Sequence, residues 1–238
     1  MSEPLRIGLV AEGPTDYEII NAALLAVLPV PFVMTLLQPE NTQPRFGSGW
    51  GGVLKWCHAA SQRHAGPLTQ DPTLARFDLL IIHLDADVAA KSYADCGPWA
   101  ADNAPANGWG ALPCEQACPP VADTCTALER VLLSWLGHAT ADDKTIRCIP
   151  AQSTGAWLAC AVLDESDPLL EDAECNPELE NQLARLSKAQ RIKKTVAEYR
   201  RFAPAVTAEW DKVKTLCSQA GSFEQRAREL VSCLPPAR

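Results

Sequence analysis

The sequence predicts an α/β protein with a mostly parallel, Rossmann-like sheet flanked by helices. Short and almost uninterrupted apolar runs, such as residues 7–10 and 79–84, are typical of parallel strands that are covered on both faces. Helical patterns follow these runs, and strands that alternate with helices indicate βαβ crossovers. Both runs end in acidic residues. Because the carboxyl ends of neighbouring parallel strands face one crevice, we expect these acids to converge.

Periodicity and boundary residues predict the individual strands and helices. Thr15, with Glu18 three residues later, forms the pattern of a capping box at a helix start, and Pro29 ends that helix. A Pro- and Gly-bearing loop precedes the second helix. The elements expected in this half of the chain are strands at 6–10, 31–37 and 77–84 and helices at 15–28 and 51–61.

From residue 89 to about 120, periodicity vanishes among Gly, Pro, Asn and Cys residues. A structureless loop of that length is unusual in a compact domain, so we expect a functional flap, a partner surface or a cysteine-stapled excursion. Beyond it, the expected elements are a strand at 145–149 and helices at 124–136, 153–163, 177–186, 189–202, 204–220 and 223–233.

With 238 residues, 47% hydrophobic and 21% charged, the chain has the composition of an ordinary globular protein. We expect an α/β core at 1–163, interrupted by an insertion at about 89–123. The helical carboxyl-terminal extension, 164–238, should pack on that core, because its helices are short and the sheet is their best apolar partner.

The apolar segments are too short for a membrane protein. The best of them, residues 19–34, is interrupted by Pro29 and Pro31, whereas a spanning helix needs about 20 apolar residues. The amino end enters a strand pattern almost at once and has no basic region followed by an apolar one. We therefore expect a cytoplasmic protein with no membrane partner.

The net charge of −8 argues against a surface built for nonspecific duplex binding. However, residues 164–180 hold eight acids and no Lys or Arg, and residues 185–201 hold seven basic residues against Glu198 alone. The basic stretch either meets a phosphate backbone or is a solvated helix face paired with the acidic stretch. Its members include Lys188, Arg191, Lys193, Lys194, Arg200 and Arg201.

Four of the ten cysteines lie near one another, at Cys96, Cys114, Cys118 and Cys125. Structural zinc sites generally show paired C-x₂₋₄-C knuckles, and only Cys114 and Cys118 approach that spacing. We therefore do not expect structural Zn²⁺. A local disulfide or free thiols fit this cluster better.

Three acids form the candidate catalytic and metal-binding set. Glu12 follows the first apolar run, and Asp85 and Asp87 follow the later one. Alternate residues of an extended chain point the same way, so Asp85 and Asp87 can face one ion. Carboxylates in one pocket repel each other unless a cation joins them, and their oxygens suit Mg²⁺ or Mn²⁺.

With these residues the chain resembles the Toprim family, the metal-dependent fold of topoisomerases, primases and nucleases of the overcoming-lysogenization-defect type. That family carries a Glu after its first strand and an Asp-x-Asp after a later strand, matched here by Glu12 and by Asp85 and Asp87. The resemblance covers residues 6–163. It implies a Toprim-like fold and phosphodiester hydrolysis or transfer with Mg²⁺ or Mn²⁺.

A narrower likeness is to small stand-alone Toprim-like proteins found among bacterial defence and mobile-element genes. These show a strand, a Pro and a helix that starts like Ser-Thr-Glu-Ala-Trp, where this chain has Pro150 and then Ser153-Thr154-Gly155-Ala156-Trp157. Gly155 stands where the resemblance implies a Glu and supplies no carboxylate. If that Glu helps to bind metal or activate water, the chain is impaired or inactive.

The resemblance implies that Asp85 and Asp87 hold the metal and that Glu12 completes the coordination or acts as a general base. Accessory candidates are Asp16, His83 and Lys194. Asp16 is interpreted first as a helix-dipole residue of the first turn. His83 alternates with Asp85 and so shares its face, either as a site residue or as a core histidine. Lys194 or Arg191 is a candidate for neutralising transition-state charge, although a surface role suits either residue better.

These features lead to two main functional hypotheses. The first is a metal-dependent nuclease, acting on DNA or RNA, in anti-phage defence or as a toxin. The second is a catalytically impaired subunit that binds nucleic acid or a protein partner, for example in a defence complex. A phosphohydrolase with Asp85 as nucleophile is a weaker alternative, because an acid-ending strand already precedes Asp85.

Overall fold

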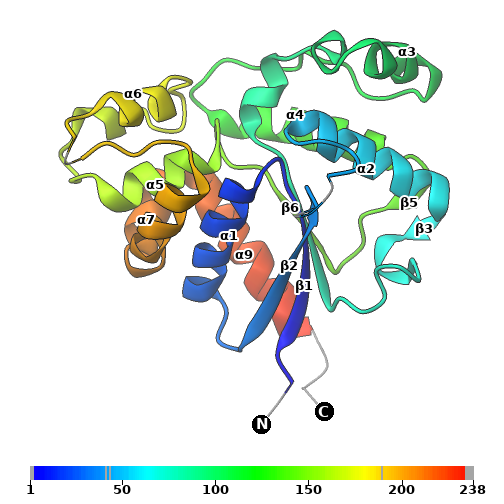
Figure 1. The fold of residues 1–238 in the computed structure, drawn as a ribbon, viewed down its shortest axis with the longest axis horizontal. Coiled ribbons are helices and arrows are strands. Elements are labelled where there is room, and N and C mark those ends of the chain that lie inside the picture. The colour runs from blue at the N-terminus through cyan, green and yellow to red at the C-terminus, as the bar shows by residue number, and fades with distance from the viewer. Residues whose placement is uncertain (1–2, 41, 43, 189, 234–238) are drawn as a thin grey trace.

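A four-stranded parallel sheet forms the centre of the computed structural model, which describes residues 3–40, 42, 44–188 and 190–233 (Figure 1). Its strand order is β2-β1-β4-β6, so the two strands that precede the acids, β1 and β4, are neighbours. This confirms the predicted α/β class and parallel sheet. The strands are β1 (Leu5–Val10), β2 (Phe32–Gln38), β4 (Leu79–His83) and β6 (Thr145–Cys148), with a separate short pair, β3 (Gly66–Pro67) and β5 (Ala139–Thr140).

Helices cover both faces of the sheet, as the apolar strands predict. Ile7 and Leu9 of β1 pack against α1, α5 and the carboxyl-terminal helices, whereas Leu80 and Ile82 of β4 belong to the opposite core, against α2 and α4. The core helices are α1 (Pro14–Val27), α2 (Trp50–Arg63), α4 (Val121–Trp135) and α5 (Thr154–Val162). Within the described part of the chain, no helix is both long and apolar enough to cross a bilayer.

The predicted capping box of Thr15 and Glu18 at the start of α1 is wrong. Gly13 is the N-cap, and the Asp16 carboxylate accepts a 2.8 Å hydrogen bond from the Gly13 backbone N–H. Pro14 explains the earlier start, because proline has no N–H to satisfy and its fixed φ suits the first helical position. Asp16, rather than Glu18, therefore faces back towards the end of β1.

The insertion is folded, although its sequence shows no periodicity. It contains the 3₁₀ turns η2 (Ala86–Ala90) and η3 (Tyr93–Cys96) and helix α3 (Pro98–Ala106). The Tyr93 hydroxyl donates to the Gly110 carbonyl at 2.7 Å and accepts from Trp135 Nε1 of α4 at 2.9 Å. Aromatic packing onto α4 thus orders a segment that has no helical periodicity of its own.

The carboxyl-terminal extension packs on the core through α7, which lies against α1. Arg200 of α7 pairs with Glu18 at 2.7 Å, and the Thr207 hydroxyl donates to the Ala22 carbonyl at 2.8 Å. The elements of the extension are η4 (Pro168–Leu170), α6 (Leu179–Arg185), α7 (Val196–Ala208), α8 (Trp210–Leu216) and α9 (Ser218–Cys233).

Several predicted helix boundaries in the extension are wrong, among them the start expected at Phe223, because α9 begins at Ser218. The helix expected at 189–202 begins only at Val196, because Thr195 caps α7 and the Ile192 N–H bonds instead to the Leu183 carbonyl. The helix start expected at Pro204 is also wrong, since Pro204 lies inside α7 and the break falls at Glu209.

A disulfide between Cys118 and Cys175 joins the insertion to the extension. The expectation of a disulfide within the cysteine cluster is therefore wrong, because the partner of Cys118 lies 57 residues away. Cys96, Cys114 and Cys125 are free thiols. Among the described residues, the groups that could hold a metal consist of Asp, Glu and His side chains.

Removing this disulfide should lower stability, because the bond restricts the unfolded chain. We expect Cys118→Ser to reduce the free energy of unfolding by about 2–4 kcal/mol in urea titrations. Cys233→Ser, which removes an exposed free thiol, is the matched control and should change little. The unfolded, unreduced wild type should titrate as eight thiols, and ten would contradict the assignment.

Candidate metal centre

The three predicted acids meet at the carboxyl ends of β1 and β4. Val10 pairs with Ile82 in the register of these strands, so the residues that follow emerge side by side. The Asp85 backbone N–H donates to Glu12 Oε1 at 2.8 Å. One carboxylate oxygen from each of Glu12, Asp85 and Asp87 lies within 4.8 Å of the others. Asp85 is buried, Glu12 half-buried and Asp87 exposed, so the group opens to solvent at Asp87.

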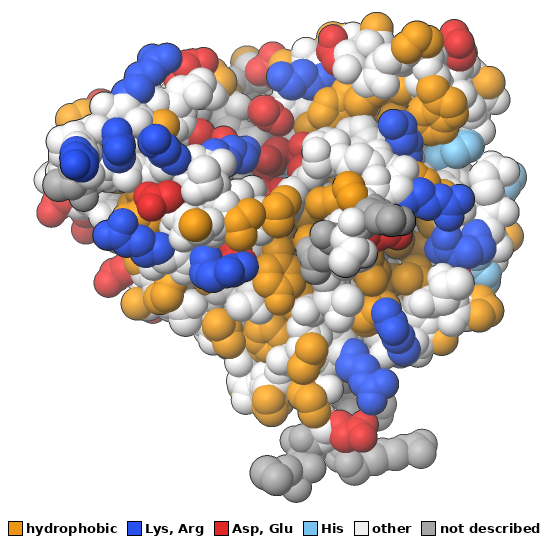
Figure 2. Space-filling model, in the orientation of Figure 1, with side chains coloured by type: hydrophobic (Ala, Val, Ile, Leu, Met, Phe, Trp, Pro, Cys, Tyr) orange, Lys and Arg blue, Asp and Glu red, His pale blue; other side chains and the backbone are white. Residues whose placement is uncertain are grey.

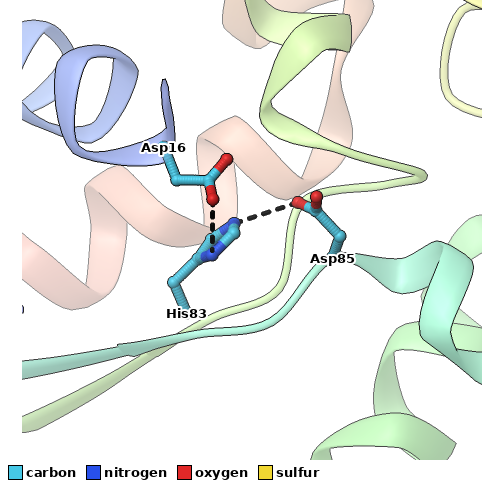
Figure 3. A group of neighbouring side chains, drawn as sticks. All are labelled: Asp16, His83 and Asp85. Atoms are coloured by element: carbon cyan, nitrogen blue, oxygen red, sulfur yellow. Dashed lines mark ion pairs between the residues drawn. The ribbon is translucent and has the colours of Figure 1, made fainter. Parts of the chain in front are cut away.

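Asp16, His83 and Asp85 form a second, fully buried group that shares Asp85 with the first (Figure 3). His83 Nε2 lies 3.0 Å from Asp85 Oδ1, and its Nδ1 lies 3.9 Å from Asp16 Oδ2. These are ion-pair distances, but neither ring nitrogen is aligned for a hydrogen bond with any described residue. The structure therefore places His83 on the face of Asp85, as its alternation predicts.

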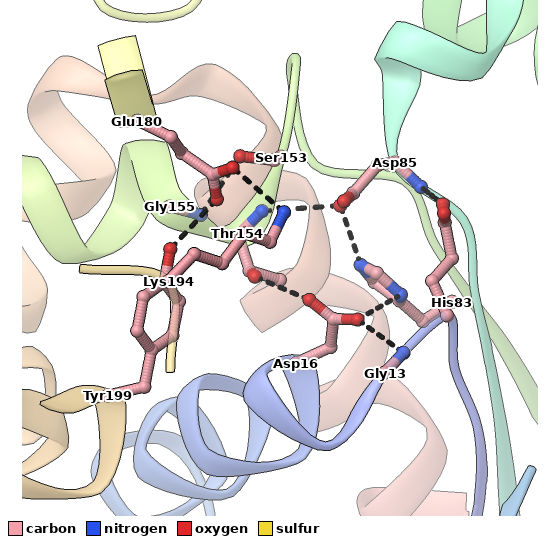
Figure 4. A network of polar contacts seen from close by, with 11 residues as sticks. Gly13, Asp16, His83, Asp85, Ser153, Thr154, Gly155, Glu180, Lys194 and Tyr199 are labelled. Carbon is pink, nitrogen blue, oxygen red and sulfur yellow. Dashed lines mark hydrogen bonds and ion pairs between the residues drawn. The ribbon is translucent and has the colours of Figure 1, made fainter. Parts of the chain in front are cut away.

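The start of α5 supports both groups (Figure 4). The Thr154 hydroxyl donates to Asp16 Oδ1 at 2.8 Å, and the Thr154 backbone N–H donates to Asp85 Oδ1 at 3.3 Å. Asp16 thus contacts site residues in addition to its place in the first turn of α1. The segment with the Ser-Thr-x-Ala-Trp likeness lies directly beside the acids.

The acids are electrostatically unfavourable without a cation. Burial, reinforced by Asp85 and Asp16, raises the pKa of Glu12 well above its ordinary value. Burial also raises the pKa of Asp85 to about 6, although His83 opposes the shift. Burial raises the pKa of Asp87 too, while Lys91 and Lys194 lower it. A bound cation would favour the ionised form of all three carboxylates.

His83 supplies part of the positive charge that a bound cation would bring. Burial by itself would lower its pKa, but the carboxylates of Asp16 and Asp85 outweigh burial and raise the pKa. The imidazolium form is therefore favoured between these two carboxylates. A metal ion that entered this group would have to replace the proton on His83.

Lys194 lies at the rim of the site and pairs with a residue that the sequence analysis missed. Its Nζ donates to Glu180 Oε2 at 2.8 Å. Burial would lower the pKa of Lys194, but Asp85, Glu180 and Asp16 raise it. The only sequence signal for Glu180 is its place at the end of the acidic stretch 164–180, and nothing in that stretch distinguishes it from its neighbours.

The interpretation of the basic stretch as a helix face paired with acidic residues accounts for part of it. Lys194 pairs with the acidic stretch through Glu180, whereas Arg200 pairs with Glu18 on α1. Lys188, Arg191 and Lys193 are exposed. Figure 2 shows acidic side chains in a hollow of this face, with Lys and Arg side chains around it.

The space at Gly155 is occupied by Glu180. A Cβ at position 155 would lie 2.8 Å from Glu180 Cδ and closer still to its Oε1. The position expected to carry a glutamate therefore has a glutamate carboxylate against it, supplied by α6. By contrast, a cavity of about 160 Å³ near α4 and α9 contains none of the site acids, and its Arg147 and Arg226 pair with Glu129.

Comparisons of this chain with protein-family models, with curated proteins and with solved structures find no match. The Toprim resemblance therefore stays a prediction, and the function is argued from the site itself.

Proposed function

We propose that this protein is a metal-dependent nuclease that cleaves phosphodiester bonds with Mg²⁺ or Mn²⁺. The supporting observation is the meeting of Glu12, Asp85 and Asp87, whose ligand oxygens lie within 4.8 Å of one another. Carboxylate oxygens are the ligands that these hard cations prefer. The same residues carry the resemblance to the Toprim family.

Each site residue has a role that follows from its position. Asp85 and Asp87 would hold the ion, and Glu12 would complete its coordination or accept a proton. A bound divalent ion supplies stabilisation of the charge that develops on the phosphoryl oxygens. Asp16 and Thr154 orient the buried carboxylate of Asp85 through His83 and the start of α5. Lys194 brings positive charge to the rim, where a nucleic acid phosphate would approach.

The resemblance also supports a role in bacterial anti-phage defence or as a toxin, and a cytoplasmic location is a separate expectation from the sequence pattern. The Cys118–Cys175 disulfide is evidence against a cytoplasmic location, because disulfides are rare in reducing compartments. The competing proposal is a catalytically impaired Toprim-like subunit that binds nucleic acid or a protein partner. The net charge of −8 and the glycine at position 155 favour it.

The test is cleavage of labelled DNA and RNA, single- and double-stranded, by protein stripped of metal with a chelator. We expect cleavage only after Mg²⁺ or Mn²⁺ is added, and none with Asp85→Asn. Asp78→Asn is the matched control, because Asp78 precedes the same strand, β4, at its opposite end, where it accepts the Arg6 N–H. Mn²⁺ binding without cleavage would support the impaired subunit, and absence of Mn²⁺ binding would overturn the metal centre.

A further inference from the structure

Glu180 of α6 lies against the backbone of Gly155, at the start of α5 (Figure 4). A Cβ built at position 155 would lie 2.5 Å from Glu180 Cγ and 2.8 Å from Cδ, distances that real Cβ atoms do not show. A side chain at position 155 would therefore displace Glu180 from this conformation. Glu180 thus fills the volume in which a side chain at position 155 would begin.

The start of α5 connects this carboxylate to the acidic cluster. Thr154, the neighbour of Gly155, donates its backbone N–H to Asp85 Oδ1 and its hydroxyl to Asp16 Oδ1. Glu180 therefore lies against Gly155, whose neighbour Thr154 hydrogen-bonds directly to Asp85. It reaches this place from the carboxyl-terminal extension, whereas Asp85 and Asp16 come from the core.

The Glu180 carboxylate is held in position by two donors. The Tyr199 hydroxyl donates to Oε1 at 2.8 Å, and Lys194 Nζ donates to Oε2 at 2.8 Å. A carboxylate has about four acceptor sites, so each oxygen keeps one for a further donor, such as a water molecule. Its side chain is 23% exposed, so water can reach it.

An independent observation indicates that this cluster is built for a ligand. His83 has no exposed surface and lies between Asp16 and Asp85, yet neither of its ring nitrogens makes a hydrogen bond to a described residue. Buried polar atoms are nearly always satisfied in folded proteins. Instead the ring is paired electrostatically with the two carboxylates, at 3.0 Å from Asp85 Oδ1 and 3.9 Å from Asp16 Oδ2, so this buried cluster is one that positive charge stabilises.

We propose that Glu180 is a further carboxylate of the metal centre, supplied by the extension into the space left open by Gly155. It acts as a positioning residue: it would offer its free acceptor sites to water at the metal centre, and it holds Lys194 beside the acids. This inference rests on the proposed function. The extension would then contribute a residue to the site, and Glu180 of α6 would replace the side chain that position 155 lacks.

The first test is Mn²⁺ titration of the full-length, metal-free protein by calorimetry, with no nucleic acid present. We expect Glu180→Gln, which keeps the size of the side chain but loses its charge, to weaken Mn²⁺ binding about 10-fold, the usual effect of losing a partner of a metal ligand. Glu224→Gln is the matched control. Glu224 also accepts an aromatic donor, Trp210 Nε1 at 2.7 Å, and a lysine, Lys214 Nζ at 2.8 Å, but it lies outside the cluster, so Mn²⁺ affinity should not change.

The second test moves the carboxylate back to position 155. Gly155→Glu by itself should lower the melting temperature, because the new side chain collides with Glu180. Combining Gly155→Glu with Glu180→Ala removes the collision and restores a carboxylate. This double variant should bind Mn²⁺ and cleave nucleic acid better than Glu180→Ala.

The outcomes separate this inference from the proposed function. If the wild type binds Mn²⁺ and cleaves, but Glu180→Gln matches it, only the role of Glu180 is overturned. A double variant no better than Glu180→Ala would likewise overturn it. If the wild type binds no Mn²⁺, the proposed function and the role of Glu180 both fall.

Discussion

Glu12→Gln is expected to stabilise the metal-free protein while abolishing its metal-dependent cleavage. Burial and the nearby carboxylates of Asp85 and Asp16 raise the pKa of Glu12, so its ionised form is unfavourable in the folded state at neutral pH. Glutamine removes the charge and keeps an oxygen that can accept the Asp85 N–H. The same change deletes a proposed metal ligand. Opposite effects on stability and activity are typical of residues kept for function.

The stabilisation should depend on pH in a defined direction. Below the unfolded pKa of about 4.3, Glu12 is protonated in both states and the two proteins should melt alike. As pH rises from there to the raised folded pKa, the wild type loses stability that the variant keeps. Thermal melts at pH 4 and pH 7, with chelator present, measure the difference. A variant that melts below the wild type at pH 7 would contradict the repulsion.

Glu129→Gln provides a control of opposite sign. Burial alone would raise the pKa of Glu129, but hydrogen bonds from Arg147 and Arg226 outweigh burial and lower it. Its ionised form therefore stabilises the folded state above the unfolded pKa. The same chemical substitution should then lower the melting temperature at pH 7 and leave cleavage intact.

Trp157→Ala is expected to cost about 3–5 kcal/mol of folding free energy, the range for deleting a buried aromatic side chain. Trp157 of α5 has no exposed surface, and its ring lies 5.5 Å from the Trp210 ring and 5.6 Å from the Phe223 ring, between centroids. It therefore joins the core to α8 and α9. Urea denaturation followed by tryptophan fluorescence and by circular dichroism measures the loss.

Trp157→Phe tests whether the loss comes from packing. The Trp157 indole N–H has no hydrogen-bond partner among the described residues, so phenylalanine forfeits volume but no hydrogen bond. Its cost should be clearly smaller than that of alanine. Because the extension packs on this ring, core and extension should unfold in one transition. Two separate transitions of the wild type would contradict this coupling of core and extension.

The acids of the site could be predicted because each follows a strand that can be recognised from its apolar run. The apolar runs before Glu12 and Asp85 predict parallel strands, and parallel strands end at one edge of a sheet. The position of the His83 side chain could be predicted from alternation along the strand before Asp85. In these cases the position of a residue in its element determines where its side chain lies.

Other features depend on contacts that local patterns do not encode. The bond between Cys118 and Cys175 requires their Cα atoms to be 5.7 Å apart, which only the folded chain provides. Helix α3 packs through its Trp99 ring, which lies 5.8 Å from the Trp109 ring between centroids, and its own sequence has no helical periodicity. Glu180 could not be singled out because a glycine gives no indication of which distant side chain will cover it.

The sharing of Asp85 between the two acidic groups links their occupancies. A cation held by Glu12 and Asp87 would use the same Asp85 carboxylate as a cation held by Asp16 and His83. By linkage, binding at either group must lower the affinity of the other by the same factor. A calorimetric isotherm should therefore show negative cooperativity, and a fit to independent, identical sites should fail.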